Sequence, residues 1–405
     1  MLFVGMTVAN VGNYTLNLVV GRLTSPADFS IFVSLVSLAA MLTMPVMALA
    51  TVAAKFSATF AAADRQSAVR GLFRLLDRVA LIAGIVVFIL ILVLAHPIER
   101  FLHLPTLVPL VVLAASFGLS LYLPVARGFL QGSQRFVVLS ANTAIEPIIK
   151  IVVAVGLLWL GYGVSGAIGG YGVAFVGCYL LARWVLAASL RGTGEPIDWR
   201  TLWHYSAATL VSLVALSLLT SIDVILARHY FSATDAGLYA GLATVGKIIL
   251  FVSAPLVAVM FPLIVTKLAR GERHFHLLVQ TLTITGALSL LVLIAFTARP
   301  DLAMQLLFGA KYAAIAPLLP AYGVAMLLLA IATVFVHYFL SIGFTRVSWL
   351  LLLALAVELV MTRVGALTPI QLVHVLQLVF LGLNGALGFT YLSVKRYQRQ
   401  THIHR

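Results

Sequence analysis

Long runs of apolar residues fill most of the chain, and short polar stretches separate them. About 20 apolar residues form a helix that crosses a hydrocarbon core of ~30 Å. The runs therefore predict an all-α polytopic membrane protein with about twelve spans, of which the eleventh is short and contains Glu358. The predicted spans are 2–21, 30–53, 79–96, 106–126, 137–160, 163–189, 205–227, 238–262, 278–298, 318–341, 348–363 and 371–393.

The composition indicates that lipid, not water, surrounds this protein. Of 405 residues, 62% are hydrophobic and 9% are charged, whereas a soluble domain carries about a quarter charged residues. The longest gap between spans, 54–78, has room for about one amphipathic helix. We expect this helix on the cytoplasmic leaflet, where its arginines meet anionic lipid or recruit another anionic ligand. Because Met1 leads almost directly into an apolar run, the first span is its own insertion signal, or the start is slightly truncated.

The basic residues follow the pattern of membrane topology, although the net charge of +14 could also suggest nucleic-acid binding. The loops after even-numbered spans, counted with the C-terminal tail and with Arg183 near the end of the sixth span, hold 18 of the Lys and Arg residues, and the opposite loops hold six. Positive charge stays on the cytoplasmic side. We therefore expect both termini in the cytoplasm and no nucleic acid as a partner.

Two halves of the sequence resemble each other. The segment 25–32 aligns with 232–239 at an offset of 207 residues, and later Pro109 aligns with Pro320 and 132–135 with 343–346 at an offset of 211. An offset of six spans keeps the same orientation in the membrane, so the repeat is parallel. It predicts two six-helix lobes, 1–199 and 200–405, related by a pseudo-two-fold axis along the membrane normal. Rocking of one lobe on the other would give alternating access.

Four groups of residues resemble motifs of a known family. They are GRLTSPADFSIF at 21–32, RGFLQGSQRF at 127–136, the stretch from DVILA at 223–227 through DAGLY at 235–239 and GKI at 246–248 to FP at 261–262, and LFGAKY with APL at 307–318. In this order they resemble the polysaccharide transporter branch of the multidrug/oligosaccharidyl-lipid/polysaccharide (MOP) flippase superfamily, which includes O-antigen flippases. The resemblance implies a MATE-like fold, no cofactor, and an undecaprenyl-type lipid-linked oligosaccharide as substrate in a bacterial inner membrane.

Charged residues inside spans are candidates for function because each costs about 2.5–3.5 kcal/mol to insert. Glu146 and Lys150 lie one turn apart on one face of the fifth span. Lys150 would bind the pyrophosphate of the substrate with Glu146 as its resting partner, or the two would only fix the span in its bundle. Lys247 would face the substrate, or would pair with Asp223 or Glu358.

Further candidates are the polar residues of the first and seventh spans and the charges at span ends. Glu358 would bind a coupling ion or proton, or would have a structural role. Arg22, Asp223 and Arg228 would gate the path, or would be topology and capping residues. The polar stripes would line a sugar path, or would bond helices within each bundle. They comprise Asn10, Asn13, Tyr14 and Asn17 in the first span and Ser217, Thr220 and Ser221 in the seventh.

Other chemistry finds little support in the sequence. Cys178 is the lone cysteine, so no intrachain disulfide or cysteine metal cluster is expected. The glycines between 161 and 172 indicate close helix packing, not a nucleotide loop. We therefore expect a flippase for cell-surface polysaccharide synthesis that is no enzyme, with membrane lipids, a polymerase and glycosyltransferases as partners. The alternatives are a cation-coupled multidrug exporter and a membrane-bound glycosyltransferase or polymerase.

Overall fold

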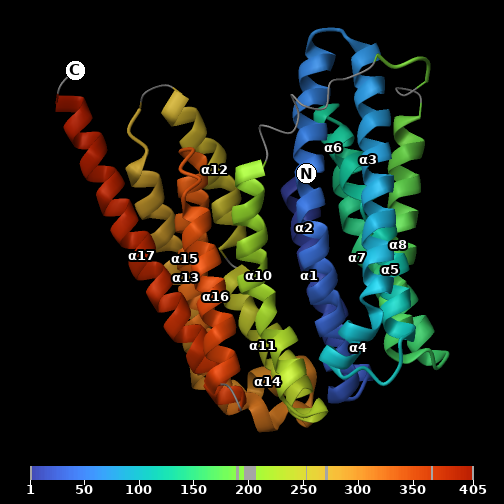
Figure 1. The fold of residues 1–405 in the computed structure, drawn as a ribbon, viewed down its shortest axis with the longest axis vertical. Coiled ribbons are helices and arrows are strands. Elements are labelled where there is room, and N and C mark those ends of the chain that lie inside the picture. The colour runs from blue at the N-terminus through green and yellow to red at the C-terminus, as the bar shows by residue number, and fades with distance from the viewer. Residues whose placement is uncertain are drawn as a thin grey trace. The chain divides into compact units, whose positions relative to one another are not determined.

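The computed structural model describes residues 2–187, 191–195, 207–251, 253–269, 272–365 and 368–403. Every regular element within these ranges is a helix. Ten helical segments of the described chain are long and apolar enough to cross a membrane. The chain divides into two compact units, Met1–Leu210 and Val211–Arg405, which Figure 1 colours from blue to green and from green to red.

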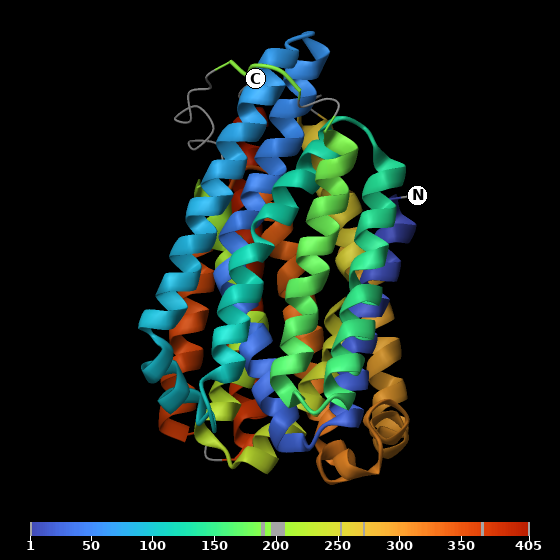
Figure 2. The same ribbon diagram turned by 90° about the vertical axis from the view of Figure 1, so that its right-hand side faces the viewer.

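Unit 1 is a bundle in which α7 packs against α1 and α8, and α2 packs against α3 and α6. Figure 1 and Figure 2 show its long helices side by side. Its elements are α1 (Leu2–Leu23), α2 (Pro26–Ala62), α3 (Gln66–Val93), α4 (Ala95–Leu102), α5 (Val108–Ser120), α6 (Tyr122–Gly132), α7 (Phe136–Trp159) and α8 (Gly163–Leu186).

Unit 2 is built around α15, which packs against α11, α12, α13 and α17. Its side chains Tyr322 and Tyr338 are fully buried. The elements of this unit are α10 (Ala207–Tyr230), α11 (Ala233–Phe251), α12 (Ala254–Ala269), α13 (Phe275–Ala298), α14 (Pro300–Phe308), the 3₁₀ helix η1 (Ala310–Leu318), α15 (Leu319–Ser341), α16 (Val347–Gly365) and α17 (Pro369–Ile403).

The segment 54–78 differs from the prediction, because it forms no separate helix on a membrane surface. Instead α2 continues to Ala62, a short turn follows, and α3 begins at Gln66. Leu72, Phe73 and Leu76 are buried in the core of unit 1 together with side chains of α2, α6 and α8. The apolar stripe that suggested lipid contact therefore packs against protein.

The fourth predicted span, 106–126, consists of two helices. Helix α5 ends at Ser120, α6 begins at Tyr122, and α6 continues to Gly132. Arg127, which the sequence placed in a cytoplasmic loop, therefore lies inside a helix. This shift brings one more charge into the interior of unit 1.

Glycines bring α8 close to α7, as the sequence indicated. A Cβ atom on Gly170 would lie 2.9 Å from the Lys150 carbonyl oxygen, and one on Gly166 would lie 2.7 Å from the Leu157 Cβ. Both distances are shorter than a van der Waals contact, so larger residues would push the helices apart. This close approach places side chains of α8 over the middle of α7.

The first aligned segments of the repeat have the same local structure. Ser25 Oγ accepts a hydrogen bond from Asp28 N at 3.1 Å and donates one to Asp28 Oδ2 at 2.8 Å. Ser232 Oγ accepts from Asp235 N at 3.1 Å and donates to Asp235 Oδ2 at 2.7 Å. The same serine cap therefore starts α2 in unit 1 and α11 in unit 2.

The later part of the repeat requires a correction of register. The turn after α6 has its left-handed residue at Gln134, and the turn after α15 has it at Gly343. In both turns this residue donates to the carbonyl three positions earlier. The equivalent residues are thus 209 positions apart, whereas Pro109 and Pro320, both at helix starts, keep the predicted 211. The two-residue difference falls in the stretch that contains the break between α5 and α6.

Removing a serine cap should measurably destabilise its unit. We expect Ser25→Ala and Ser232→Ala each to lower the free energy of unfolding by about 1 kcal/mol, because one amide at the helix start loses its acceptor. Thermal unfolding in detergent, followed by tryptophan fluorescence, measures the loss. The glycine variants at both positions serve as controls and should lose only a few tenths of a kcal/mol. An unchanged free energy of unfolding in both alanine variants would contradict the capping role.

Candidate functional site

A cluster of buried charges in unit 1 combines one carboxylate with two cations. Nζ of Lys150 donates to Oε1 of Glu146, one turn earlier in α7. The other carboxylate oxygen, Oε2, lies 2.7 Å from Nη1 of Arg127 in α6. Glu146 is 7% exposed and Lys150 is 4% exposed. Water screens such charges poorly, so each depends on the others for compensation.

Hydrogen bonds from neighbouring helices orient the two cations. Arg127 donates through Nε to Asn142 Oδ1 and through Nη2 to the Asn142 carbonyl oxygen, both at 2.8 Å. Asn142 Nδ2 donates to the carbonyl oxygen of Cys178 in α8 at 2.7 Å. Lys150 Nζ also donates to Asn13 Oδ1 in α1 at 3.1 Å. The charge cluster thus connects α1, α6, α7 and α8.

Two aromatic rings cover the ammonium group of Lys150. Its Nζ lies 4.5 Å from the centroid of the Tyr171 ring and 4.8 Å from that of Phe175, both in α8. The negative face of an aromatic ring attracts a cation. Pro147, between the two charged residues of α7, removes one backbone hydrogen bond from the helix. A substrate could contact Lys150 only if the Glu146 pair and the ring cover opened.

The polar residues of α1 have different surroundings, although they share one face. Asn13 and Asn17 donate through Nδ2 to carbonyl oxygens four residues earlier, at 2.9 Å each. Asn10 is exposed. The hydroxyl of Tyr14 is buried and has no hydrogen-bond partner among the described residues. Only Asn13 therefore joins the charge cluster.

The candidate residues of α10 and the arginines at the ends of α1 and α10 differ in burial and in hydrogen bonding. Thr220 donates to a carbonyl oxygen of its own helix at 2.8 Å, and Ser217 is half-buried. Arg22 is exposed at the end of α1, whereas Arg228 is buried near the end of α10. Their predicted roles in lining or gating remain predictions.

A second cluster, in unit 2, surrounds Asp223 of α10. Its Oδ1 lies 3.4 Å from Nζ of Lys247 in α11. Its Oδ2 accepts hydrogen bonds from the hydroxyls of Tyr322 at 2.7 Å and Tyr239 at 3.3 Å. Asp223 is 1% exposed, and the Lys247 side chain is 12% exposed. Lys247 thus has the first of the two partners that the sequence suggested, and part of its side chain remains accessible.

Glu358 in α16 is the least compensated carboxylate of the described chain. It is fully buried, and neither oxygen has a hydrogen-bond partner among the described residues. Thr362, one turn later, likewise has a buried hydroxyl without a partner there. Asp223 and Lys247 are near enough to act on Glu358 electrostatically. An ionised carboxylate without a hydrogen-bond partner is costly in an apolar interior, so the predicted role of Glu358 in binding a coupling ion or proton stays a prediction.

Sequence reasoning missed several members of these clusters. Arg127 was assigned to a loop because the predicted span ended one residue before it. Asn142 carries no signal in the sequence, because it is a single amide in an apolar run. Tyr239 and Tyr322 look like ordinary core residues, and only the fold shows that both hydroxyls meet Asp223. Within the described ranges, no group of three His, Cys, Asp or Glu side chains could hold a metal ion.

The sequence and the fold both match known proteins. Residues 2–268 match the family described as "Polysaccharide biosynthesis protein". A search of the curated proteins finds no match.

Three solved structures illustrate the structural likeness. A multidrug resistance MATE family transporter of the MOP superfamily, in an inward-facing conformation, has a TM-score of 0.80 at 13% identity, over 98% of this chain and 99% of that chain. The lipid II flippase MurJ in an inward closed conformation has a TM-score of 0.71 at 12% identity, over 95% and 87%. A MOP superfamily transporter from Pyrococcus furiosus, described by the reverse polarity of its binding pocket, has a TM-score of 0.61 at 16% identity, over 97% and 94%. These likenesses confirm the predicted all-helical, MATE-like fold.

Proposed function

Because the chain belongs to the polysaccharide biosynthesis protein family, which its residues 2–268 match, we propose that it translocates a polyprenyl-pyrophosphate-linked oligosaccharide. The substrate would cross from the cytoplasmic to the periplasmic leaflet of a bacterial inner membrane by alternating access. The fold that this multi-pass membrane protein shares with a lipid II flippase supports the proposal. The termini would lie in the cytoplasm. Glycosyltransferases would act before transport, and a polymerase would act after it.

Buried cations in both units carry the proposal about the substrate's charge. In unit 1, Arg127 and Lys150 face the single carboxylate of Glu146, which leaves one formal positive charge among them. In unit 2, Lys247 lies at a rather long 3.4 Å from its partner Asp223. A cationic path lowers the cost of moving phosphate charge through the bilayer. The excess of positive charge lies in unit 1, because the carboxylates of Asp223 and Glu358 outnumber Lys247 in unit 2.

The two clusters suit different parts of the proposed cycle. We assign direct contact with the pyrophosphate to Lys247, because its side chain is partly accessible. Glu146 and Lys150 would join the path only when their pair opens, and the amides and hydroxyls of α1 and α10 would bind the sugar. Asp223 and Glu358 would form the coupling site, and Arg22 and Arg228 would gate the ends of the path. The two units would act as the two lobes, 1–199 and 200–405, that the sequence predicts.

A proteoliposome assay with a labelled lipid-linked oligosaccharide tests the proposal. We expect Lys247→Gln to slow translocation about tenfold, the effect of losing one hydrogen bond to a charged group. Lys267→Gln is the matched control and should keep the wild-type rate, because Lys267, in the last turn of α12, pairs with the more exposed Glu272 at 2.9 Å. Unchanged translocation after Lys150→Ala and Lys247→Ala together would contradict the assigned anion contacts.

A cation-coupled drug exporter is the second candidate function, because the fold also resembles that of a MATE family transporter at a TM-score of 0.80. The same proteoliposomes, loaded with a fluorescent cationic dye, provide the test. Export of the dye without movement of the lipid-linked oligosaccharide would favour the exporter. Movement of the lipid-linked oligosaccharide alone would favour the flippase.

A further inference from the structure

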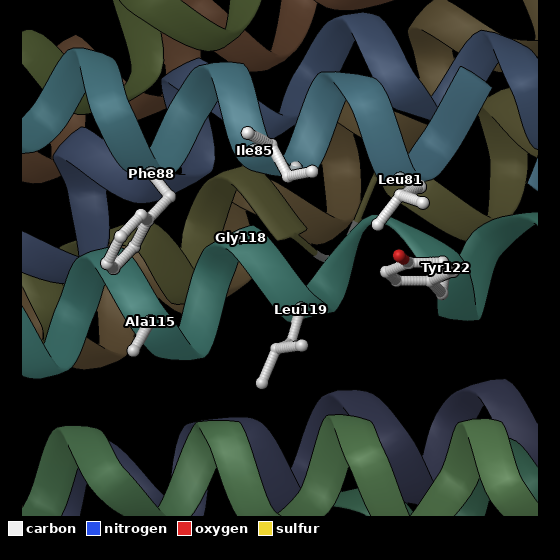
Figure 3. A pocket seen from close by; sticks show the side chains of 8 residues that line it. Leu81, Ile85, Phe88, Ala115, Gly118, Leu119 and Tyr122 are labelled. Atoms are coloured by element: carbon white, nitrogen blue, oxygen red, sulfur yellow. The ribbon is translucent and has the colours of Figure 1, made fainter. Parts of the chain in front are cut away.

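An apolar groove on unit 1 lies between α3 and the α5–α6 pair. Its volume is about 290 Å³, near the lower end for ligand pockets. A Cβ atom on Gly84 would lie 2.4 Å from the Gly118 carbonyl oxygen, so the two helices touch through their backbones. Figure 3 shows the side chains on either side of this contact, which are Leu81, Ile85 and Phe88 from α3 and Ala115, Leu119 and Tyr122 from the facing pair.

Polar side chains lie just beyond one end of the groove. Asp77 and Arg78 precede Leu81 by four and three residues, so they continue the face of α3 that lines the groove. Tyr179 of α8 donates to Asp77 Oδ1 at 2.8 Å. Arg183 Nη1 lies 3.4 Å from Asp77 Oδ2, which compensates this carboxylate. Arg78 is exposed, and its side chain makes no ion pair or hydrogen bond with any described residue.

The other arginines at this end of α3 are already engaged by the segment 191–195. Arg65 forms an ion pair with Glu195 at 2.6 Å. Arg70 and Arg74 donate to backbone carbonyl oxygens of this segment. Arg78 is therefore the cation of this group that remains available to a ligand. By the distribution of basic residues this end faces the cytoplasm, where the leaflet carries anionic lipids.

We propose that the groove binds one acyl chain of an anionic phospholipid whose phosphate contacts Arg78. The lining suits a hydrocarbon chain, because Tyr122 supplies its one polar side chain. A cation one helical turn from the groove selects lipids with net negative charge over zwitterionic lipids of the same chain length. This lipid site is separate from the two buried charge clusters, and it does not depend on the proposed transport function.

Native mass spectrometry of the full chain in detergent tests the lipid site. The probes are dioleoylphosphatidylglycerol and dioleoylphosphatidylcholine, which have identical chains. We expect the anionic lipid to bind more tightly, and Arg78→Gln to weaken its binding about fivefold without changing that of phosphatidylcholine. Leu119→Trp, which fills the groove, should weaken both. Arg100→Gln at the opposite end of the α3–α4 pair and Ile82→Trp beside the groove are the controls and should change neither.

Three results would overturn the lipid site. Equal affinity for the two lipids in the wild-type chain would remove the role of Arg78. If the Arg78→Gln variant still preferred phosphatidylglycerol to phosphatidylcholine as strongly as the wild type, the role of Arg78 would also be removed. Because Arg78 is exposed, this substitution should not disturb folding. Displacement of phosphatidylglycerol by an equal concentration of undecaprenyl phosphate would show that the groove prefers a polyprenyl phosphate to a phospholipid.

Discussion

Glu146→Gln is expected to lower the free energy of unfolding by about 3–5 kcal/mol, the usual cost of breaking a buried ion pair by removing one partner. The change leaves Arg127 and Lys150 close together with no carboxylate between them. Neither cation can turn to water easily, because Asn142 and Asn13 hold them in place. Unfolding in mixed micelles with increasing dodecyl sulfate, followed by circular dichroism, measures the loss.

Two further variants show whether charge, and not shape, causes this loss. Lys150→Met retains the contact between Glu146 and Arg127 at 2.7 Å, so it should cost less than Glu146→Gln. The double variant Glu146→Gln with Lys150→Met should recover part of the loss, because a single cation remains. If Glu146→Gln is no more destabilising than Lys150→Met, the cluster is not held together by its carboxylate.

Glu358→Gln is expected to leave the protein folded but to abolish any dependence of translocation on an ion gradient. The carboxylate is fully buried and its oxygens have no partner among the described residues, so the substitution breaks no ion pair. A charged group in this position needs a proton or a cation from outside the protein. Glutamine resembles the neutral form and cannot exchange either ion. Translocation rates in proteoliposomes with and without an imposed proton or sodium gradient provide the measurement.

One control and one variant of the second coupling-site carboxylate separate coupling from a general loss of function. Asp301→Asn removes an exposed carboxylate of α14 in the same unit and should respond to the gradient as the wild type does. Asp223→Asn weakens the contacts with Lys247 and two tyrosine hydroxyls, so it should lower stability as well. A Glu358→Gln protein that still responds fully to the gradient would rule out the coupling role.

The positions of the membrane helices could be predicted because the apolar runs report directly on solvation by lipid. Over the residues that the structure describes, each of the twelve predicted spans lies mainly on helix, and ten helical segments there are long and apolar enough to cross a membrane. The apolar run hides the break between α5 and α6, although Pro124 lies four residues after Ser120 and cannot donate the backbone hydrogen bond to its carbonyl oxygen. The length of α2 and α3 was also missed, because an amphipathic stripe packs equally well on lipid or on a neighbouring helix.

The candidate sites were only partly visible in the sequence. Helical spacing alone paired Glu146 with Lys150, since residues four apart share a face. The second cation of that cluster, Arg127, comes from another helix, and no local pattern indicates such a contact. In unit 2 the sequence left Lys247 with two possible partners, and the fold was needed to place it beside Asp223. Contacts within a helix can thus be inferred, whereas contacts between helices require the structure.

Pro147 gives the charged cluster of unit 1 a mechanical consequence. The proline removes a rung from the backbone hydrogen-bond ladder of α7, and helices bend most readily at such points. Glu146 and Lys150 stand on either side of it, and their ion pair bridges the weak point. The ion pair therefore restrains bending of α7 at the proline. An anion that drew the ammonium group away from Glu146 would remove this restraint and let the helix flex at its midpoint.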